Sequence, residues 1–315
     1  MSDPDAWPTL PYADWTSTRE ALHRWTQIVG KIRVAQEPWL NHSWHVGLYV
    51  SARGLQSGPI PCGRQILDAE FDFVDQTLRF RTSSGASNEV KLRTQSVAGF
   101  FAGVQAALAA LGLDIAIDGR PNEIPDATPF AQDTEIRDYD PEAARRFWRA
   151  LVQADRVFRA FRTAFLGKAS PVHFFWGSFD LAVSRFSGRR APLHPGGVPA
   201  LPDAVAQEAY SHEVSSAGFW PGGGGVDYAA FYSYAYPAPE GFADGKLSPP
   251  EAFFHKGLGE FVLPYDAVRQ AADPDGTLRA FLQGAYDLAA DLGRWDRAAL
   301  ECEPGTPRRP RPVAP

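Results

Sequence analysis

The chain is poor in sulfur-containing residues, since its 315 residues include two cysteines and one methionine. Cys62 and Cys302 are distant in the sequence, so a disulfide framework like that of small secreted domains is not expected. Residues 1–5 are acidic and lack the apolar segment of a secretory signal peptide. Together these features predict a protein of the reducing cytoplasm.

Long apolar runs and basic clusters are also missing. No stretch of about 18 apolar residues is present, so no membrane-spanning helix is expected. The formal net charge is −6 and the only basic block is short, at residues 308–311, so the basic footprint of a nucleic-acid-binding protein is absent. The partner class that remains is a small molecule, and the oligomeric state is left open.

The sequence lacks the short motifs of several enzyme classes. It has no Gly-x-Ser-x-Gly, no dinucleotide-binding fingerprint, no His-Glu-x-x-His and no Cys-x-x-Cys. The glycine run at residues 222–225 precedes neither a helix start nor a Lys-Ser/Thr pair, so it predicts a strand connection rather than a phosphate-binding loop. We therefore predict no cofactor and no metal.

Aromatic residues are abundant: they make up 13% of the chain and include nine tryptophans. Most are expected in the core, where large rings contribute much of the buried area. Two segments combine aromatic residues with histidine, at residues 39–53 and 171–185. Each follows an amphipathic helix and predicts a β-strand. This pattern favours a concave, aromatic-lined site to which both halves of the chain contribute.

The spacing of apolar residues predicts an α+β fold. In the first half, residues 1–120, helical periodicity begins after Trp15 and ends at Pro38, and a second helix begins with Ser96 as its N-cap and ends at Gly112. Strands are predicted between and after these helices, at residues 45–55, 66–73, 78–82, 89–92 and 113–117.

The second half, residues 140–300, follows a linker predicted at residues 121–139, which are rich in proline and aspartate. Asp140-Pro141 and Asp273-Pro274 are helix-start signals. Strands are predicted between these two helices, at residues 172–186, 208–219, 229–236 and 260–263. The proline-rich residues 301–315 predict a disordered tail.

The order helix, antiparallel strands, helix therefore occurs twice. We infer two similar halves, each an antiparallel sheet backed by helices, and an internal duplication. The alternative is an ordinary α+β arrangement in which the order recurs by coincidence, since few residue identities repeat between the halves.

The strand predicted at residues 172–186 carries two candidate catalytic residues, His173 and Asp180. Alternation along a regular strand places them on opposite faces, with Asp180 on the face that also carries Trp176. A buried aspartate requires a partner, and a neighbouring arginine such as Arg185 or Arg190 could supply one in a purely structural ion pair.

His212 and Glu213 are the other candidate catalytic residues. A regular strand places His212 on one face with Tyr210, and Glu213 on the other. Histidine is suited to proton transfer near neutral pH. His212 would then act as an acid or base, with Glu213 as a general base or a group that orients its partner.

The ligand-binding candidates are aromatic residues, a histidine and an arginine: Trp44, His45, Trp176, Arg190, Tyr210, Tyr232 and Tyr234. The rings would hold an apolar or ring-shaped part of a ligand, and the guanidinium an anionic group. His42 and His45 are three residues apart and point to opposite faces of a strand, so hydrogen-bonded structural roles are favoured over a shared metal.

Three functions are compatible with these residues. The first is an enzyme acting on a small organic molecule in an aromatic-lined cleft. The second is a non-catalytic binding module that uses the same cleft. The third is a structural or interaction protein whose polar strand residues satisfy one another. An enzyme should bring a histidine and a carboxylate together at the floor of a pocket.

Several long stretches resemble an uncharacterised bacterial family, the domain-of-unknown-function family 5996. They are WPTLPY at residues 7–12, LHRWTQIVGKIR at 22–33, NHSWH at 41–45, PVHFFWGSFD at 171–180 and YSHEVSSAGFWP at 210–221. The resemblance spans nearly the whole chain. It implies a single full-length family unit in a bacterial cytosol, and it implies no substrate, cofactor or catalytic residue.

Overall fold

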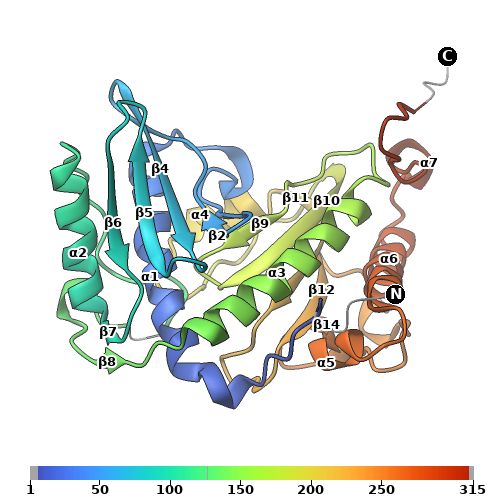
Figure 1. Ribbon diagram of the computed structural model, residues 1–315. Helices are drawn as coiled ribbons and strands as arrows, with labels where there is room; N and C mark the ends of the chain where they lie inside the picture. Colours follow the sequence, from blue (N-terminus) through green and yellow to red (C-terminus); the bar gives the residue numbers. More distant parts are fainter. Residues whose placement is uncertain (1–5, 126, 312–315) are drawn as a thin grey trace. The chain divides into compact units, whose positions relative to one another are not determined.

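Helices and antiparallel sheets make up the computed structural model, which describes residues 6–125 and 127–311 (Figure 1). This confirms the predicted α+β class. The predictions for residues 1–5 and 312–315 lie outside the described residues.

The chain divides into two units by its internal contacts. Unit 1 comprises Met1–Val152, His173–Asp180 and His194–Ala209, and unit 2 comprises Gln153–Val172, Leu181–Leu193 and Tyr210–Pro315. The linker predicted at residues 121–139 and the start of the following helix lie in unit 1, and the predicted domain bounds stay a prediction.

The helices of unit 1 follow local sequence signals. α1 (Thr16–Gln36) ends just before Pro38, and α2 (Val97–Ala110) begins where Ser96 Oγ accepts a hydrogen bond from the backbone N–H of Gly99. Both helix starts are confirmed. Trp25 of α1 stacks on Phe100 of α2 with 4.6 Å between ring centroids. The other helices of the unit are the start of α3 (Pro141–Arg162), α4 (Asp203–Ala209), η1 (Tyr12–Trp15), η2 (Asn41–Ser43) and η3 (Phe130–Gln132).

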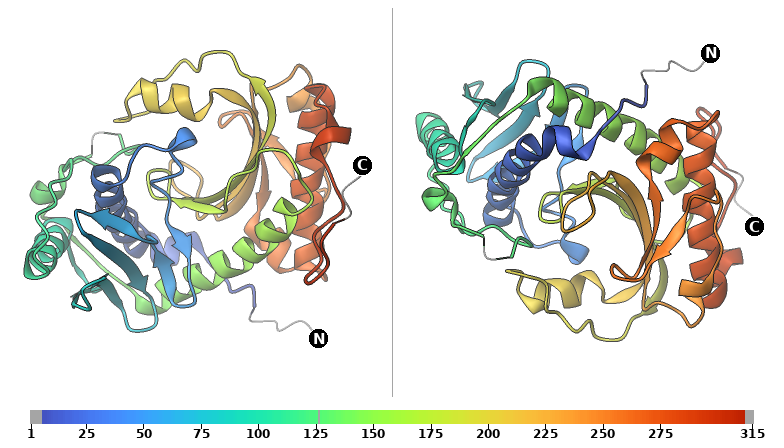
Figure 2. Two further views of the ribbon diagram at one scale, coloured as in Figure 1. Left: turned by 90° about the horizontal axis from the view of Figure 1, so that it is seen from above. Right: turned by 90° about the horizontal axis from the view of Figure 1, so that it is seen from below.

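The sheet of unit 1 has α1 against one of its faces (Figure 2). Its order is β1-β2-β4-β5-β6, with β3 paired to β4. The strands are β1 (Tyr49–Val50), β2 (Gly54–Gln56), β3 (Ile60–Cys62), β4 (Gln65–Asp72), β5 (Thr77–Thr82) and β6 (Ser87–Lys91). The strands predicted at residues 66–73 and 78–82 are confirmed as β4 and β5, which form an antiparallel hairpin in which Asp72 pairs with Thr77. β7 (Gln95–Ser96) pairs with β8 (Ile136–Arg137).

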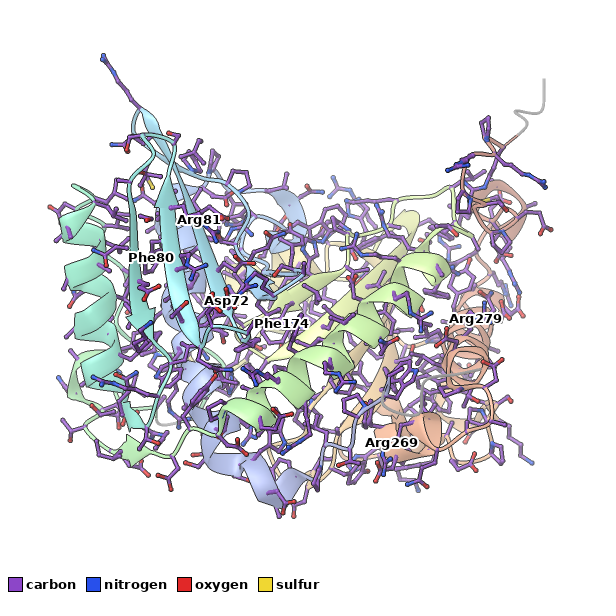
Figure 3. The ribbon with its side chains drawn as sticks, viewed as in Figure 1. Asp72, Phe80, Arg81, Phe174, Arg269 and Arg279 are labelled. Atoms are coloured by element: carbon purple, nitrogen blue, oxygen red, sulfur yellow. The ribbon has the colours of Figure 1, made fainter. Side chains whose placement is uncertain are left out.

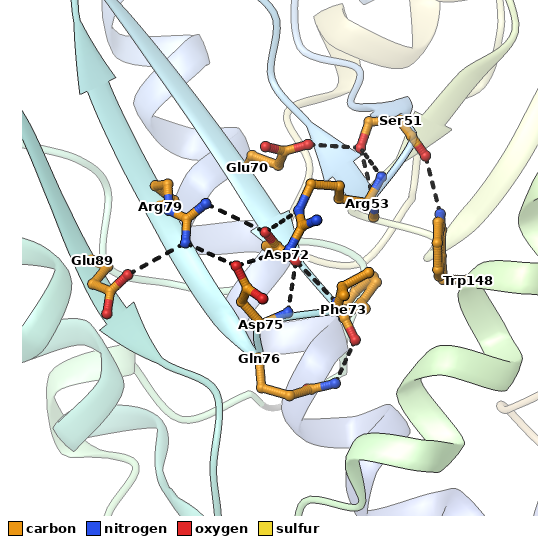
Figure 4. A network of polar contacts seen from close by, with 12 residues as sticks. Ser51, Arg53, Glu70, Asp72, Phe73, Asp75, Gln76, Arg79, Glu89 and Trp148 are labelled. Carbon is orange, nitrogen blue, oxygen red and sulfur yellow. Dashed lines mark hydrogen bonds and ion pairs between the residues drawn. The ribbon is translucent and has the colours of Figure 1, made fainter. Parts of the chain in front are cut away.

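The turn between β4 and β5 is built around a fully buried carboxylate, Asp72 (Figures 3 and 4). Asp72 Oδ1 accepts hydrogen bonds from the backbone N–H groups of Val74 and Asp75, each at 2.9 Å. Asp72 Oδ2 lies 2.5 Å from Arg53 Nε and 3.5 Å from Arg79 Nη1. Burial alone would raise the pKa of Asp72, but these donors hold it below its ordinary value.

Three strands predicted from the sequence differ in the structure: two are interrupted and one does not form. Residues 45–55 form the short strands β1 and β2 with a turn between them, and residues 113–117 form no strand. The predicted strand 172–186 is broken into β9 (His173–Phe175) and β10 (Asp180–Arg190), because Phe179 has a left-handed φ of 61°. The alternation predicted across residues 176–179 is therefore wrong. β9 is anchored by reciprocal backbone hydrogen bonds between Phe174 and Leu48.

Unit 2 is a curved antiparallel sheet with α6 on its outer side (Figure 2). Its strands follow the order β13-β14-β12-β11-β10, with β10 contributing Leu181–Arg190. Their bounds are β11 (His212–Trp220), β12 (Ala230–Tyr236), β13 (Phe253–His255) and β14 (Glu260–Pro264). The helices are the end of α3, α5 (Tyr265–Arg269), α6 (Pro274–Leu292), α7 (Arg297–Leu300) and η4 (Phe242–Asp244).

The predicted start of α6 is confirmed, because Asp273 Oδ1 accepts a hydrogen bond from the backbone N–H of Gly276. The strand predicted at residues 208–219 begins later, at His212, because residues 203–209 form α4. The two sheets differ in strand order, so the inferred duplication stays a hypothesis. Residues 303–311 of the predicted tail are exposed and form neither helix nor strand.

Candidate active site

A polar stripe runs along α1 in unit 1. His23, Gln27 and Lys31 recur every four residues, so they share one side of the helix. Gln27 is fully buried and Lys31 is 5% exposed, although both side chains are polar. Buried polar groups are costly without partners, so this stripe marks a place where α1 faces other polar groups.

The first partner of the stripe is the segment that contains Asn122. Gln27 Nε2 donates to the backbone carbonyl of Asn122 at 2.9 Å, and the Asn122 N–H donates to Gln27 Oε1 at 2.7 Å. Lys31 Nζ donates to Asn122 Oδ1 at 2.5 Å and lies 3.4 Å from Asp118 Oδ2. Burial lowers the pKa of Lys31, and Asp118 offsets part of that effect. These contacts fix the backbone that carries the next residue, Glu123.

Glu123 is held in an unusual setting. Its backbone has a left-handed φ of 60°, and its N–H donates to the Pro199 carbonyl at 2.8 Å. The carboxyl group lies directly over Gly177, where an added Cβ would be 2.0 Å from Glu123 Oε1. Among the residues that the structure describes, none supplies a hydrogen bond or a cation to this carboxyl group.

The neighbouring charge is a second carboxylate, Asp180, which is 5% exposed. Burial and then the charge of Asp180 raise the pKa of Glu123 to about 7. Asp180 Oδ1 accepts a hydrogen bond from Ser178 Oγ. Glu123, which is half-buried, and the buried Asp180 therefore form an acid pair, in which Glu123 is partly protonated near neutral pH.

The turn at residues 176–179 is fixed from α1. His23 Nε2 lies 2.7 Å from the Gly177 carbonyl, which can only accept, so Nε2 carries the proton. Burial, opposed by that hydrogen bond, lowers the pKa of His23 to about 4, so the ring is neutral at pH 7. Its ring packs on Phe179 with 5.0 Å between centroids.

Trp176 forms an aromatic wall beside this turn. Its Nε1 donates to the Val46 carbonyl at 2.8 Å, and Lys31 Nζ lies 6.0 Å from the centroid of its ring. The ring approaches α1 closely at Gly30, where an added Cβ would be 2.0 Å from Trp176 Nε1. An acid with a pKa near 7, a buried carboxylate, a buried cation and a buried aromatic ring thus lie in one region of unit 1.

Two of the residues predicted from the sequence, Asp180 and Trp176, belong to this region. His173 is fully buried elsewhere in the unit, with Trp44, Tyr49 and Phe175 as ring neighbours. Its setting is that of a core residue.

His45 and His42 each form a hydrogen bond with a backbone group of unit 1. His45 Nδ1 accepts from the backbone N–H of Leu40 at 3.2 Å, and burial, only partly offset by that bond, lowers its pKa. His42 Nδ1 lies 2.8 Å from the Ala209 carbonyl, and its backbone N–H donates to Glu208. Among the described residues, no group of three or more His, Cys, Asp or Glu side chains is placed to hold a metal ion.

The remaining predicted residues lie in unit 2. Glu213 accepts hydrogen bonds from Ser187 Oγ at 2.9 Å and from Arg189 Nη2 at 2.6 Å, and Arg189 also donates to the Gly293 carbonyl just after α6. These contacts account for Glu213 as part of a surface ion pair. His212 pairs across the strands with Arg190.

The predicted tyrosines of unit 2 are joined through their hydroxyl groups. Tyr210 Oη and Tyr234 Oη are 2.8 Å apart, and Tyr234 also bonds to Ser216, whose Oγ is 2.9 Å from Ser184 Oγ. Burial raises the pKa of Tyr234 well above its ordinary value. Tyr232 lies two residues away on the same face of β12, with its ring stacked against that of Tyr234. The predicted meeting of His173 and Asp180 with His212 and Glu213 involves both units and stays a prediction.

Sequence reasoning missed His23, Gln27, Lys31 and Glu123. The four-residue spacing of His23, Gln27 and Lys31 is visible in the sequence, but the helix was predicted from the apolar residues on its other side. Glu123 had no comparable signal, because it lies in a proline-rich segment and meets Gly177 only through the fold.

The fold and site define an α+β protein with a pair of carboxylic acids, Glu123 and Asp180, beside the buried ring of Trp176. A family model covers residues 7–302, and the chain belongs to this family, described as "Family of unknown function (DUF5996)". No curated protein and no solved structure matches the chain. No helix within the described residues has the length and apolar character needed to cross a membrane.

Proposed function

We propose that the protein is an enzyme that moves protons to and from a small organic molecule, with Glu123 and Asp180 as its acid and base. The observation that carries the proposal is the position of the Glu123 carboxyl group, which lies over Gly177 beside buried Asp180 without a cation of its own. Folding alone does not favour such a pair, whereas catalytic sites commonly contain one.

The roles follow from the different surroundings of the two acids. With a pKa of about 7, Glu123 is partly protonated near neutral pH and can donate its proton to a reacting group. Asp180, oriented by Ser178, can accept a proton from the same molecule. The neutral His23 positions the turn through Gly177 rather than taking part in proton transfer.

Trp176 and Lys31 favour a substrate that has a flat or apolar part. The indole ring would pack against that part, and the ammonium group, already paired with Asn122, would stay at the edge of the site. The low cysteine content favours a reaction in the cytoplasm.

The test is a search for a chemical change that depends on Glu123. A small-molecule cell extract in D2O would be incubated with the wild type, with Glu123→Gln and with Glu142→Gln, and followed by NMR and mass spectrometry. Glu142 lies at the start of α3 with a side chain that is 59% exposed, so its variant is a matched control. We expect at least one compound to exchange hydrogen or be converted by the wild type and the control, but not by Glu123→Gln. Absence of any change, or an equal change with Glu123→Gln, would contradict the proposal.

The linked hydroxyl groups of unit 2 favour a second candidate function, a non-catalytic binding module. A chain of hydroxyl groups can present both donors and acceptors to a polar ligand. Tyr210, Tyr232 and Tyr234 would hold the ligand, with Arg190 as an anchor for an anionic group. A thermal-shift screen would compare Tyr234→Phe with Tyr228→Phe, because Tyr228 is 37% exposed. A ligand whose stabilising effect is lost only in Tyr234→Phe would support this function.

A further inference from the structure

A polar pocket of about 360 Å3 opens in unit 1, and Ile124 and Pro125, which follow Glu123 in the sequence, are among the residues that line it. Its volume lies in the range of small-molecule sites. The polar residues that line it include Arg24, Thr128, Gln132, Asp133, Glu135 and Arg137. Two guanidinium groups in one polar pocket suggest recognition of an anion.

Arg137 forms the inner wall, with a side chain that is 6% exposed. Its Nη1 donates to Asp133 Oδ1 at 2.9 Å, and its Nη2 donates to Glu135 Oε2 at 2.9 Å. Its Nε is buried and has no hydrogen-bond acceptor among the described residues, and it lies 3.9 Å from Glu20 Oε2.

Arg24 has more donors than partners. Its Nη1 donates to the Glu20 carbonyl at 3.1 Å, and its Nε lies 3.5 Å from Asp133 Oδ2. Within the described part of the chain, Nη2 has no acceptor. Burial and the nearby charge of Arg137 both lower the pKa of Arg24, so the two cations are close enough to repel each other.

The acidic residues of the pocket do not satisfy both cations. Asp133 is buried and shared between the two arginines. Glu135 is on the surface, with a side chain that is 71% exposed, so it can leave Arg137 at little cost. An incoming oxyanion would replace the exposed carboxylate and meet the unused N–H groups of Arg24.

We propose that this pocket binds the carboxylate or phosphate group of a small anionic molecule, with Arg24 as its main contact. A guanidinium group matches either oxyanion with two parallel hydrogen bonds. Thr128 and Gln132 line the same pocket and offer neutral donors to the rest of the ligand. The proposal is separate from the acid pair and does not depend on catalysis by Glu123.

Isothermal titration calorimetry at low ionic strength tests the proposal, with inorganic phosphate in one arm and succinate in the other. The anion that binds more tightly identifies the preferred group. Arg24→Gln should weaken binding by about tenfold or more, because it removes the main charged donor. Arg64→Gln is the matched control, since Arg64 is exposed in a turn outside the pocket. It makes the same change of charge and should leave the affinity unchanged.

Gln132→Glu provides a second variant that does not disturb the core. Gln132 is an exposed residue of the pocket, so this change adds a negative charge at the surface and should also weaken binding. If Arg24→Gln fails to fold, the anion affinity of Gln132→Glu tests the proposal instead. The proposal is overturned if neither anion binds the wild type at about 10 mM. It is equally overturned if the folded pocket variants bind as the wild type does.

Discussion

Two carboxyl groups of unit 1, the fully buried Asp72 and the half-buried Glu123, differ in the charges that surround them. Burial by itself raises the pKa of both. Asp72 is surrounded by two arginines and two backbone N–H groups, and its pKa falls below the ordinary value. Glu123 has the carboxylate Asp180 as its charged neighbour, and its pKa rises to about 7.

These opposite pKa shifts mean that the charge of Asp72 stabilises the fold, whereas the carboxyl group of Glu123 lowers its stability. The partners of Asp72 close the β4–β5 turn, so its charge contributes to folding (Figure 4). Glu123 must stay protonated or be ionised inside the protein beside a like charge. A residue that lowers folding stability in this way is expected where activity requires it. At a position without a function, a stabilising replacement is easily found.

The largest expected effect is the loss of the Asp72 charge. Asp72→Asn should lower the free energy of unfolding by about 3 kcal/mol at pH 7, because it leaves buried donors without their anion. Asp75→Asn, at a side chain that is 50% exposed, should cost less than about 1 kcal/mol. Urea titrations of both variants would measure the difference.

The pH dependence of Asp72→Asn checks the same interpretation. The pKa of Asp72 is lowered in the folded state, so its contribution is present above the ordinary value of 3.8 and is lost as the pH falls further. The difference in unfolding free energy between the wild type and Asp72→Asn should therefore become smaller as the pH falls below 3.8. A gap that is constant down to pH 3 would show that the charge is not responsible.

The unfolding free energy of Glu123→Gln relative to the wild type should change with pH in the opposite direction to that of Asp72→Asn. The folded-state pKa of Glu123, about 7, exceeds its ordinary value of 4.5, so the unfolded chain releases a proton that the folded chain keeps. Wild-type stability therefore falls as the pH rises from 4.5 to 7. Relative to wild type, Glu123→Gln should gain about 2 kcal/mol of unfolding free energy between pH 5 and pH 8. Denaturation at both pH values would measure this, and a gain that is independent of pH would contradict it.

Gly177→Ala tests whether the close approach to the turn holds Glu123 in place. The added Cβ would be 2.0 Å from Glu123 Oε1, so the carboxyl group must move. We expect a cost of about 1 kcal/mol in stability and a pKa of Glu123 closer to 4.5, measured by 13C NMR of its carboxyl carbon. Gly119→Ala is the control, because its Cβ would meet no atom within 4 Å. Equal pKa values in the two variants would show that the approach to Gly177 is unimportant.

Local signals in the sequence predicted much of the fold. Ser96 and Asp273 cap the helices that follow them, as their side-chain chemistry indicates. The strands predicted at residues 66–73 and 78–82 form the β4–β5 hairpin. The break between β9 and β10 was not predictable in this way, because it depends on a left-handed backbone at Phe179, where sequence rules favour glycine.

The candidate site was predicted only in part. Asp180 stood out as a carboxylate within an aromatic strand pattern, and Trp176 as an aromatic residue expected on the same face. The stripe of His23, Gln27 and Lys31 could have been found from its helical spacing. Glu123 could not, because its carboxyl group gains its properties from burial and from Asp180, which is distant in the sequence.

The smallest expected effect separates the two causes of the raised Glu123 pKa. Asp180→Asn removes the neighbouring charge but leaves Glu123 buried, and burial is the larger cause. The pKa of Glu123 should therefore fall below 7 and stay above its ordinary value of 4.5, as followed by 13C NMR. Asp114→Asn, at an exposed position, makes the same change of charge and should have no effect. An unchanged pKa in Asp180→Asn would show that the two acids do not interact, and the acid pair would be reduced to a single buried glutamic acid.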